Sequence, residues 1–331
     1  MTESRAVVLG GGGVAGIAWT AGVLAALIDA GVPVADADLV VGTSAGAVAG
    51  AHLAGGKAAV RDLLRRQTDP EAQTPELPSP VGFEALLASW SVFIDIADPE
   101  ERGRAAGRLA LAARTVSEAE RAAVIRARVP AVAAAPTATA APAVPTSAAV
   151  PVSAAVSASA TVSTSAVSAI STVPAAAPGT PTASATPRWP ERRLVVVAVD
   201  AATGRTALFD RDSGVPLVDA LTASCALPGA WPPATIGAAR YLDGAIRTMT
   251  NADLAAGHDR VLVIAPMAAL DRDLDGQVQT LRGKVGVLSP DEAALRAFGP
   301  DPLAAGTRAA GAEAGYAHGT AWADEAAAVW A

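Results

Sequence analysis

Short apolar runs alternate with stretches of helical period along the first part of the chain. Residues 6–9 are wholly apolar and enter a glycine-rich loop, after which residues 17–30 follow a helical period. A second apolar run, at residues 39–41, precedes a helical pattern over residues 45–53. Apolar runs of this length, separated by helical segments, are typical of buried strands in a βαβ unit. The sequence therefore predicts a parallel sheet whose first two strands flank a helix.

Later patterns extend this alternation along the rest of the chain. Helical periods cover residues 57–67, 82–96, 100–115, 117–128, 215–223, 251–256, 290–298 and 301–329. Strand-like runs cover residues 194–200, 206–209, 239–242 and 260–265. We therefore expect an α/β fold, a three-layer α/β/α sandwich in which helices cover both faces of a mostly parallel central sheet.

The alternation stops between Arg128 and Arg188, where the chain carries no charged residue and consists mainly of Ala, Pro, Ser, Thr and Val. Its proline-free part, residues 152–173, has the length of a transmembrane helix, but Ser or Thr occupies ten of these 22 positions. Such a polar composition does not favour membrane insertion and is typical of a linker. We expect a disordered, low-complexity insert at residues 129–187 that interrupts a single domain formed by residues 1–128 and 188–331.

Composition narrows the possible functions. The net charge is −7 and the Lys and Arg residues form no dense cluster, which argues against a nucleic-acid partner. The single cysteine, Cys225, excludes an internal disulfide and a cysteine-based metal site. We expect neither a metal ion nor a cofactor. The N-terminus lacks the pattern of a secretory signal peptide, so a cytoplasmic protein is the expectation. Brief contact with a membrane surface is compatible with this composition.

One serine lies in a motif for nucleophilic catalysis. The pentapeptide GTSAG at residues 42–46 matches G-x-S-x-G, in which the serine lies on a strained turn between a strand and a helix. Ser44 follows an apolar run and precedes a helical pattern, as this motif requires. The amide end of the following helix favours negative charge near the serine oxygen. Ser44 is therefore the candidate nucleophile.

The glycine-rich loop before the first helix allows two interpretations. Acyl transfer to a serine needs donors for the developing oxyanion, and the backbone N–H groups of Gly11, Gly12 and Gly13 can converge on one oxygen at a helix start. Residues 11–16 also match the G-x-G-x-x-G pattern of dinucleotide-binding proteins. That pattern calls for an acidic residue at the end of the second strand, where this chain has the GTSAG motif instead. A noncatalytic dinucleotide-binding protein is the alternative from a different class.

The general base has several candidates. His52 lies eight residues past Ser44 on the same helix, roughly 12 Å along the axis at 1.5 Å per residue, too far to reach the serine. His258 and His318 are most simply explained as surface or helix-end residues. The chain order of serine, aspartate and histidine nevertheless keeps a Ser-His-Asp triad esterase of the α/β-hydrolase type open. Asp243, which follows a short strand and precedes a glycine, offers a carboxylate at a loop edge.

Three motifs in this order resemble the patatin-like phospholipase family: GGGVAG at residues 11–16, GTSAG at residues 42–46, and DGA at residues 243–245. The resemblance implies a lipid acyl hydrolase that acts on a phospholipid or another lipid ester through an acyl-enzyme. It also implies a Ser–Asp dyad without histidine, with Ser44 as nucleophile and Asp243 as general base, and an oxyanion hole in the glycine loop. The glycines that would support these motifs are Gly16, Gly42, Gly46 and Gly244.

The chain departs from the family pattern at two places. Many members carry a basic residue where this chain has Ala15, which bears on the anion affinity of the glycine loop. The charge-free segment at residues 129–187 is also foreign to the family. A further block, residues 223–228, resembles one that packs near the site, and no catalytic role is expected for it.

Overall fold

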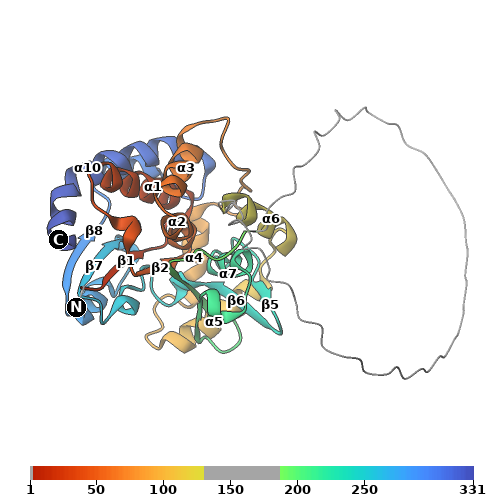
Figure 1. Cartoon of the computed structure of the whole chain (residues 1–331). Helices are drawn as coiled ribbons and strands as arrows, with labels where there is room; N and C mark the ends of the chain where they lie inside the picture. Colours follow the sequence, from red (N-terminus) through yellow and green to blue (C-terminus); the bar gives the residue numbers. More distant parts are fainter. Residues whose placement is uncertain (1–2, 130–186) are drawn as a thin grey trace, which may run out of the picture. The chain divides into compact units, whose positions relative to one another are not determined.

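The computed structural model describes residues 3–129 and 187–331, which belong to one compact unit (Figure 1). Residues 130–186 of the predicted low-complexity insert lie outside the described residues. None of the helices in the two described ranges combines the length and apolarity needed to cross a bilayer.

The sheet follows the predicted α/β pattern. Five strands are parallel, in the order β3, β2, β1, β7 and β8. Their bounds are β1 Arg5–Leu9, β2 Leu39–Thr43, β3 Arg193–Asp200, β7 Arg260–Ile264 and β8 Lys284–Leu288. Beyond β3 the sheet continues antiparallel through β6 (Ala239–Asp243) and β5 (Ala234–Ile236), and β4 (Thr206–Phe209) also pairs antiparallel with β3. The mostly parallel central sheet is thereby confirmed.

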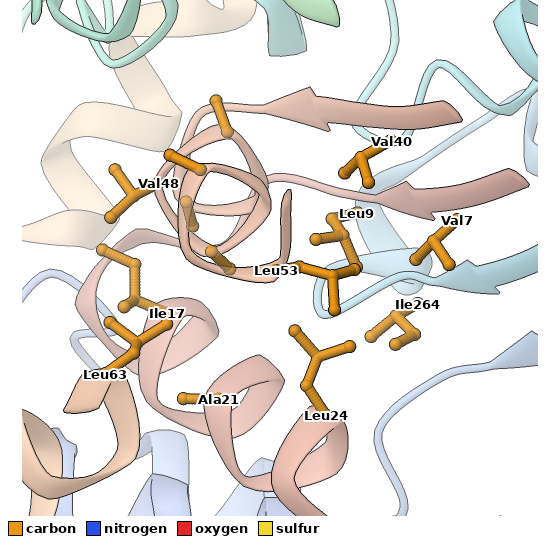
Figure 2. Close-up of a cluster of buried hydrophobic side chains, with 14 of the residues drawn as sticks. Val7, Leu9, Ile17, Ala21, Leu24, Val40, Val48, Leu53, Leu63 and Ile264 are labelled. Atoms are coloured by element: carbon orange, nitrogen blue, oxygen red, sulfur yellow. The ribbon is translucent and has the colours of Figure 1, made fainter. Parts of the chain in front are cut away.

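Alternate residues of the central strands face two different helical layers. Val7, Leu9, Val40 and Ile264 pack in one cluster against one set of helices (Figure 2). These helices are α1 (Gly13–Asp29), α2 (Ala45–Ala54), α3 (Lys57–Thr68), α7 (Leu217–Ser224), α9 (Glu292–Phe298) and α10 (Arg308–Trp330). The intervening residues Ala6, Val8, Val41 and Val263 pack against the 3-10 helix η5 (Ala252–Ala255) and α8 (Leu274–Thr280). This alternation follows from the two-residue period of a strand and gives the three-layer sandwich.

A third apolar cluster adjoins the ends of β3 and β6. It contains residues of α4 (Phe83–Ser89), η2 (Trp90–Val92) and α5 (Pro99–Ala112), packed with Val199, Leu242 and Trp231. The next helix, α6 (Glu118–Arg128), begins at a capping box in which Ser117 and Glu120 bond reciprocally. These four helical elements precede β3 in the chain and bring their side chains to the edge of the sheet.

Several helix boundaries differ from the sequence expectation. The predicted helix over 82–96 ends at Ser89 and continues only as the short η2. The helix predicted from residue 301 begins at Arg308, because Pro302 and a short 3-10 turn precede it. Its glycines permit close packing on α1, which lies beside α10 (Figure 1). A side chain at Gly315 would overlap the Trp19 backbone.

Candidate active site

Ser44 occupies a strained turn between β2 and α2. Its φ of 53° and ψ of −117° are rare for a residue with a side chain. The Ser44 N–H donates to Ser224 Oγ at 2.9 Å, and Ser224 is fully buried at the end of α7. α2 packs so tightly that a Cβ at Gly46 would overlap the Leu9 carbonyl. The backbone strain at Ser44 is therefore held in place by packing on both sides of the turn.

The register of β3 brings Asp243 to the serine. Thr43, the last residue of β2, pairs with Val197 of β3, and Asp243, the last residue of β6, pairs with the next residue, Ala198. The ends of β2 and β6 therefore meet along consecutive positions of one strand. Ser44 and Asp243 line the same cavity. The structure thus brings together the two residues that the sequence proposed as a dyad.

The Asp243 carboxylate is fully buried and only partly hydrogen-bonded. Its Oδ1 accepts the Ala245 N–H at 2.9 Å, while Oδ2 has no hydrogen-bond partner among the described residues. Burial raises the pKa of Asp243 to about 7, although the Ser44 hydroxyl, the Ala245 N–H and the Arg121 charge favour the ionised form. The Ser44 hydroxyl is thus close enough to influence the carboxylate without forming a hydrogen bond to Oδ2. A carboxylate that titrates near neutral pH suits a general base.

The glycine loop between β1 and α1 lies against Ser44. A Cβ placed on Gly11 would be 3.6 Å from Ser44 Cβ. The Gly11 N–H is already used, because it donates to the Met249 carbonyl at 2.8 Å. The N–H groups of Gly12 and Gly13, at the start of α1, have no acceptor among the described residues. All three glycines line the cavity, so two free amides are available there to an anionic oxygen.

The three histidines lie away from Ser44. His52 is buried, with its ring nitrogens 3.0 Å from the Ala59 carbonyl oxygen and 2.8 Å from that of Arg128. His258 precedes β7, at the end of the parallel sheet opposite to Ser44. His318 packs on the Trp19 ring at 5.8 Å between centroids. None of them lines the cavity.

The rest of the cavity is mainly apolar. Its apolar lining includes Val14, Ile17, Phe83, Trp90, Leu227, Trp231, Met249, Met267, Leu270 and Leu303. Cys225, Glu76, Arg121 and Arg128 add polar groups. Burial raises the pKa of the Cys225 thiol to about 11, so it stays protonated at neutral pH. The cavity has about 50 Å³ of free volume.

Two residues near the site were not assigned a role from the sequence. Ser224 lies in the block at residues 223–228 and orients the Ser44 backbone, as described above. Asn251 is buried with a φ of 58°, and its Nδ2 donates to Thr43 Oγ1 at 3.0 Å and to the Gly244 carbonyl at 3.3 Å. Asn251 therefore joins the serine strand to the aspartate loop. No periodicity marks a single buried asparagine in a loop.

The fold and this geometry define an α/β protein with a serine on a strained turn beside a buried carboxylate. The sequence model of the patatin-like phospholipase family matches residues 7–256. The chain belongs to the patatin-like phospholipase family, as its three motifs suggested. No curated protein matches the chain. Membership of this family indicates a lipid acyl hydrolase, an enzyme that acts on lipid esters.

Proposed function

We propose that the protein hydrolyses lipid esters with a Ser44–Asp243 dyad. The observation that carries this proposal is the buried Asp243 carboxylate, whose Oδ2 is free, in the same cavity as a serine with strained backbone. No histidine lines this cavity, so we assign the proton-accepting role to Asp243, which does line it. Its pKa of about 7 leaves a substantial ionised fraction at neutral pH.

The reaction proceeds in two halves. Asp243 removes the proton from Ser44 Oγ as this oxygen attacks the ester carbonyl carbon. The resulting oxyanion accepts hydrogen bonds from the glycine loop, where Gly12 and Gly13 have free N–H groups. Gly11 contributes a third donor only when its bond to the Met249 carbonyl opens. The alcohol then leaves with the proton from Asp243, and water activated by Asp243 hydrolyses the acyl-serine.

The substrate is a phospholipid or another lipid ester. The apolar lining of the cavity favours an acyl chain. The free volume of about 50 Å³ is smaller than a long acyl chain, so we infer that side chains at the cavity move when such a chain binds. Val92 is 62% exposed and lines an outer groove together with Arg108 and Arg114. We infer that this surface makes transient contact with lipid.

Hydrolysis of a soluble ester tests the proposal. p-Nitrophenyl butyrate should be hydrolysed by the wild type, not by Ser44→Ala, and barely by Asp243→Asn. His258→Ala and His318→Ala serve as matched controls and should retain activity. Loss of activity in either folded histidine variant would favour a triad instead. Activity in Ser44→Ala would refute the nucleophile, and binding of a dinucleotide without any ester hydrolysis would favour the nucleotide-binding alternative.

A further inference from the structure

Four charged side chains meet at the edge of the Ser44–Asp243 cavity. Glu76, from the loop between α3 and α4, is surrounded by Arg121 and Arg128 of α6 and by Arg308 of α10. Arg121 Nη1 lies 3.4 Å from Glu76 Oε1, and Arg308 Nη2 lies 3.3 Å from Glu76 Oε2, which also pairs with Arg128. None of these side chains is more than 8% exposed. The group is a buried charge cluster, not a surface salt bridge.

The positive charges in this cluster are not balanced. Three guanidinium groups face one carboxylate, and the other nearby acid, Asp243, is only partly ionised at neutral pH. Burial and the charge of Arg128 lower the pKa of Arg121 to about 10, which still leaves it protonated near neutral pH. Excess buried charge is unfavourable unless a counter-charge accompanies it. The net positive charge of the cluster therefore favours binding of an anion.

Two of the guanidinium groups can present donors to the cavity. Arg121 and Arg128 line it with Ser44, whereas Arg308 does not and is held by the Thr74 carbonyl at 2.9 Å. Of the guanidinium nitrogens of Arg121 and Arg128, only Nη1 of Arg121 and Nη2 of Arg128 donate hydrogen bonds to other described residues. Arg121 Nε is buried without a partner.

Packing fixes the orientation of one of these donors. The Arg121 guanidinium lies 4.0 Å from the centroid of the Trp231 ring, which restricts its plane. A fixed guanidinium fork matches the two oxygens of a carboxylate or a phosphate. The unused donors and the unbalanced charge thus point to the same kind of ligand.

We propose that Arg121 and Arg128 form an anion-binding site inside the cavity, and that the enzyme prefers esters carrying a carboxylate or phosphate group over neutral esters. This inference rests on the proposed hydrolase function for its substrate, and it adds the group that the substrate must present. Glu76 holds the two arginines in place and neutralises one of the three positive charges.

Two matched pairs of soluble esters test the preference. p-Nitrophenyl hexanoate and mono-p-nitrophenyl adipate differ in a carboxylate at the end of the acyl chain. Dibutyrylglycerol and dibutyryl phosphatidate differ in a phosphate on the alcohol side. In at least one pair, kcat/KM should be about tenfold or more higher for the anionic ester, as expected for charge-assisted hydrogen bonds. The pair that responds identifies which side of the substrate carries the anion.

Arginine variants test which residues are responsible. The anionic-to-neutral ratio should fall about tenfold in Arg121→Gln and in Arg128→Gln. It should be unchanged in Arg296→Gln, whose side chain is exposed on α9. A ratio of one in both pairs for the wild type would overturn the proposal, as would a preference that survives in both cavity variants.

A binding measurement decides the inference independently of hydrolysis. In Ser44→Ala protein, adipate or inorganic phosphate should change tryptophan fluorescence saturably, because Trp231 contacts Arg121 and Trp90 also lines the cavity. Adding Arg121→Gln should abolish this response. Absence of a saturable response to both anions would overturn the anion site. If the wild type hydrolyses none of the esters, the proposed function fails, while this binding result still decides the anion site.

Discussion

Replacing Asp243 with asparagine should remove activity and, at alkaline pH, stabilise the fold. The reason is that burial raises the pKa of this carboxyl from 3.8 to about 7. Well below pH 4 the carboxyl is protonated in both the folded and the unfolded protein, so it does not make the free energy of unfolding depend on pH. As the pH rises towards 7, the unfolded state loses this proton first, so the free energy of unfolding decreases. The asparagine side chain does not ionise, so the free energy of unfolding of Asp243→Asn does not show this decrease.

The size of the effect follows from the shift. About three pKa units at 1.36 kcal/mol each give a loss of roughly 4 kcal/mol between about pH 4 and pH 8. The difference in unfolding free energy between Asp243→Asn and wild type should grow by about that amount over this range. Over the same range, wild-type kcat/KM on a soluble ester should rise with a midpoint near pH 7, because only ionised Asp243 acts as base.

Urea denaturation of both proteins at several pH values measures this difference directly. Asp212→Asn, which removes an exposed carboxylate, is the control for the loss of one negative charge. The difference in free energy of unfolding between Asp212→Asn and wild type should stay nearly constant with pH. If the difference in free energy of unfolding between Asp243→Asn and wild type did not change with pH, burial would not raise the pKa of Asp243 as proposed. An activity profile without a transition near pH 7 would refute the role of Asp243 as base.

Three other substitutions probe the surroundings of the site. Asn251→Ala removes the hydrogen bonds to Thr43 and Gly244. Urea denaturation should show that the free energy of unfolding falls by about 2–4 kcal/mol. The kcat should also fall, because these bonds hold the segments of Ser44 and Asp243 together. Ser224→Ala leaves the partly buried Ser44 N–H without its acceptor. We expect a loss of about 1–3 kcal/mol in the free energy of unfolding and, in steady-state kinetics, a lower kcat with little change in KM. A stable, fully active variant at either position would contradict these roles. Val92→Ser should weaken hydrolysis of vesicle lipid severalfold and spare a soluble ester, whereas equal effects on both substrates would argue against lipid contact at this surface.

Hydrophobic patterning was sufficient for the central strands but not for the edges of the sheet. The runs that became β1, β2, β3 and β7 are apolar throughout because helices cover both faces of the parallel sheet. β8 was missed: Lys284 and Val287 are exposed and Gly286 interrupts the apolar pattern. β5 was also missed, because three residues are too few for a recognisable alternation.

The sequence alone could predict only part of the candidate site. Ser44 and the glycine loop lie in local motifs, so their proximity to a helix start could be predicted. Asp243 was one of several possible bases until its resemblance to a family motif singled it out. The sequence pattern could not show that β3 places it beside Ser44, because these two residues are about 200 positions apart in the chain and meet only through the pairing of β2 and β6 with β3.

The arginine cluster illustrates a limit of helical patterning. Arginines on an amphipathic helix are expected on its exposed face, and Arg121 and Arg128 belong to such a helix. They are buried because Glu76, Trp231 and Arg308 come from distant segments to surround them. No local pattern encodes that convergence. The same holds for Asn251, whose partners lie on β2 and in the loop after β6.

Labelling with a fluorophosphonate tests the central claim most directly, because this reagent reacts with an activated serine whatever the natural substrate is. The wild type should take up one equivalent, and peptide mapping should place it on Ser44. Ser44→Ala should not be labelled, and Asp243→Asn should react far more slowly. Labelling of another residue, or unchanged labelling of Ser44→Ala, would contradict the proposed nucleophile.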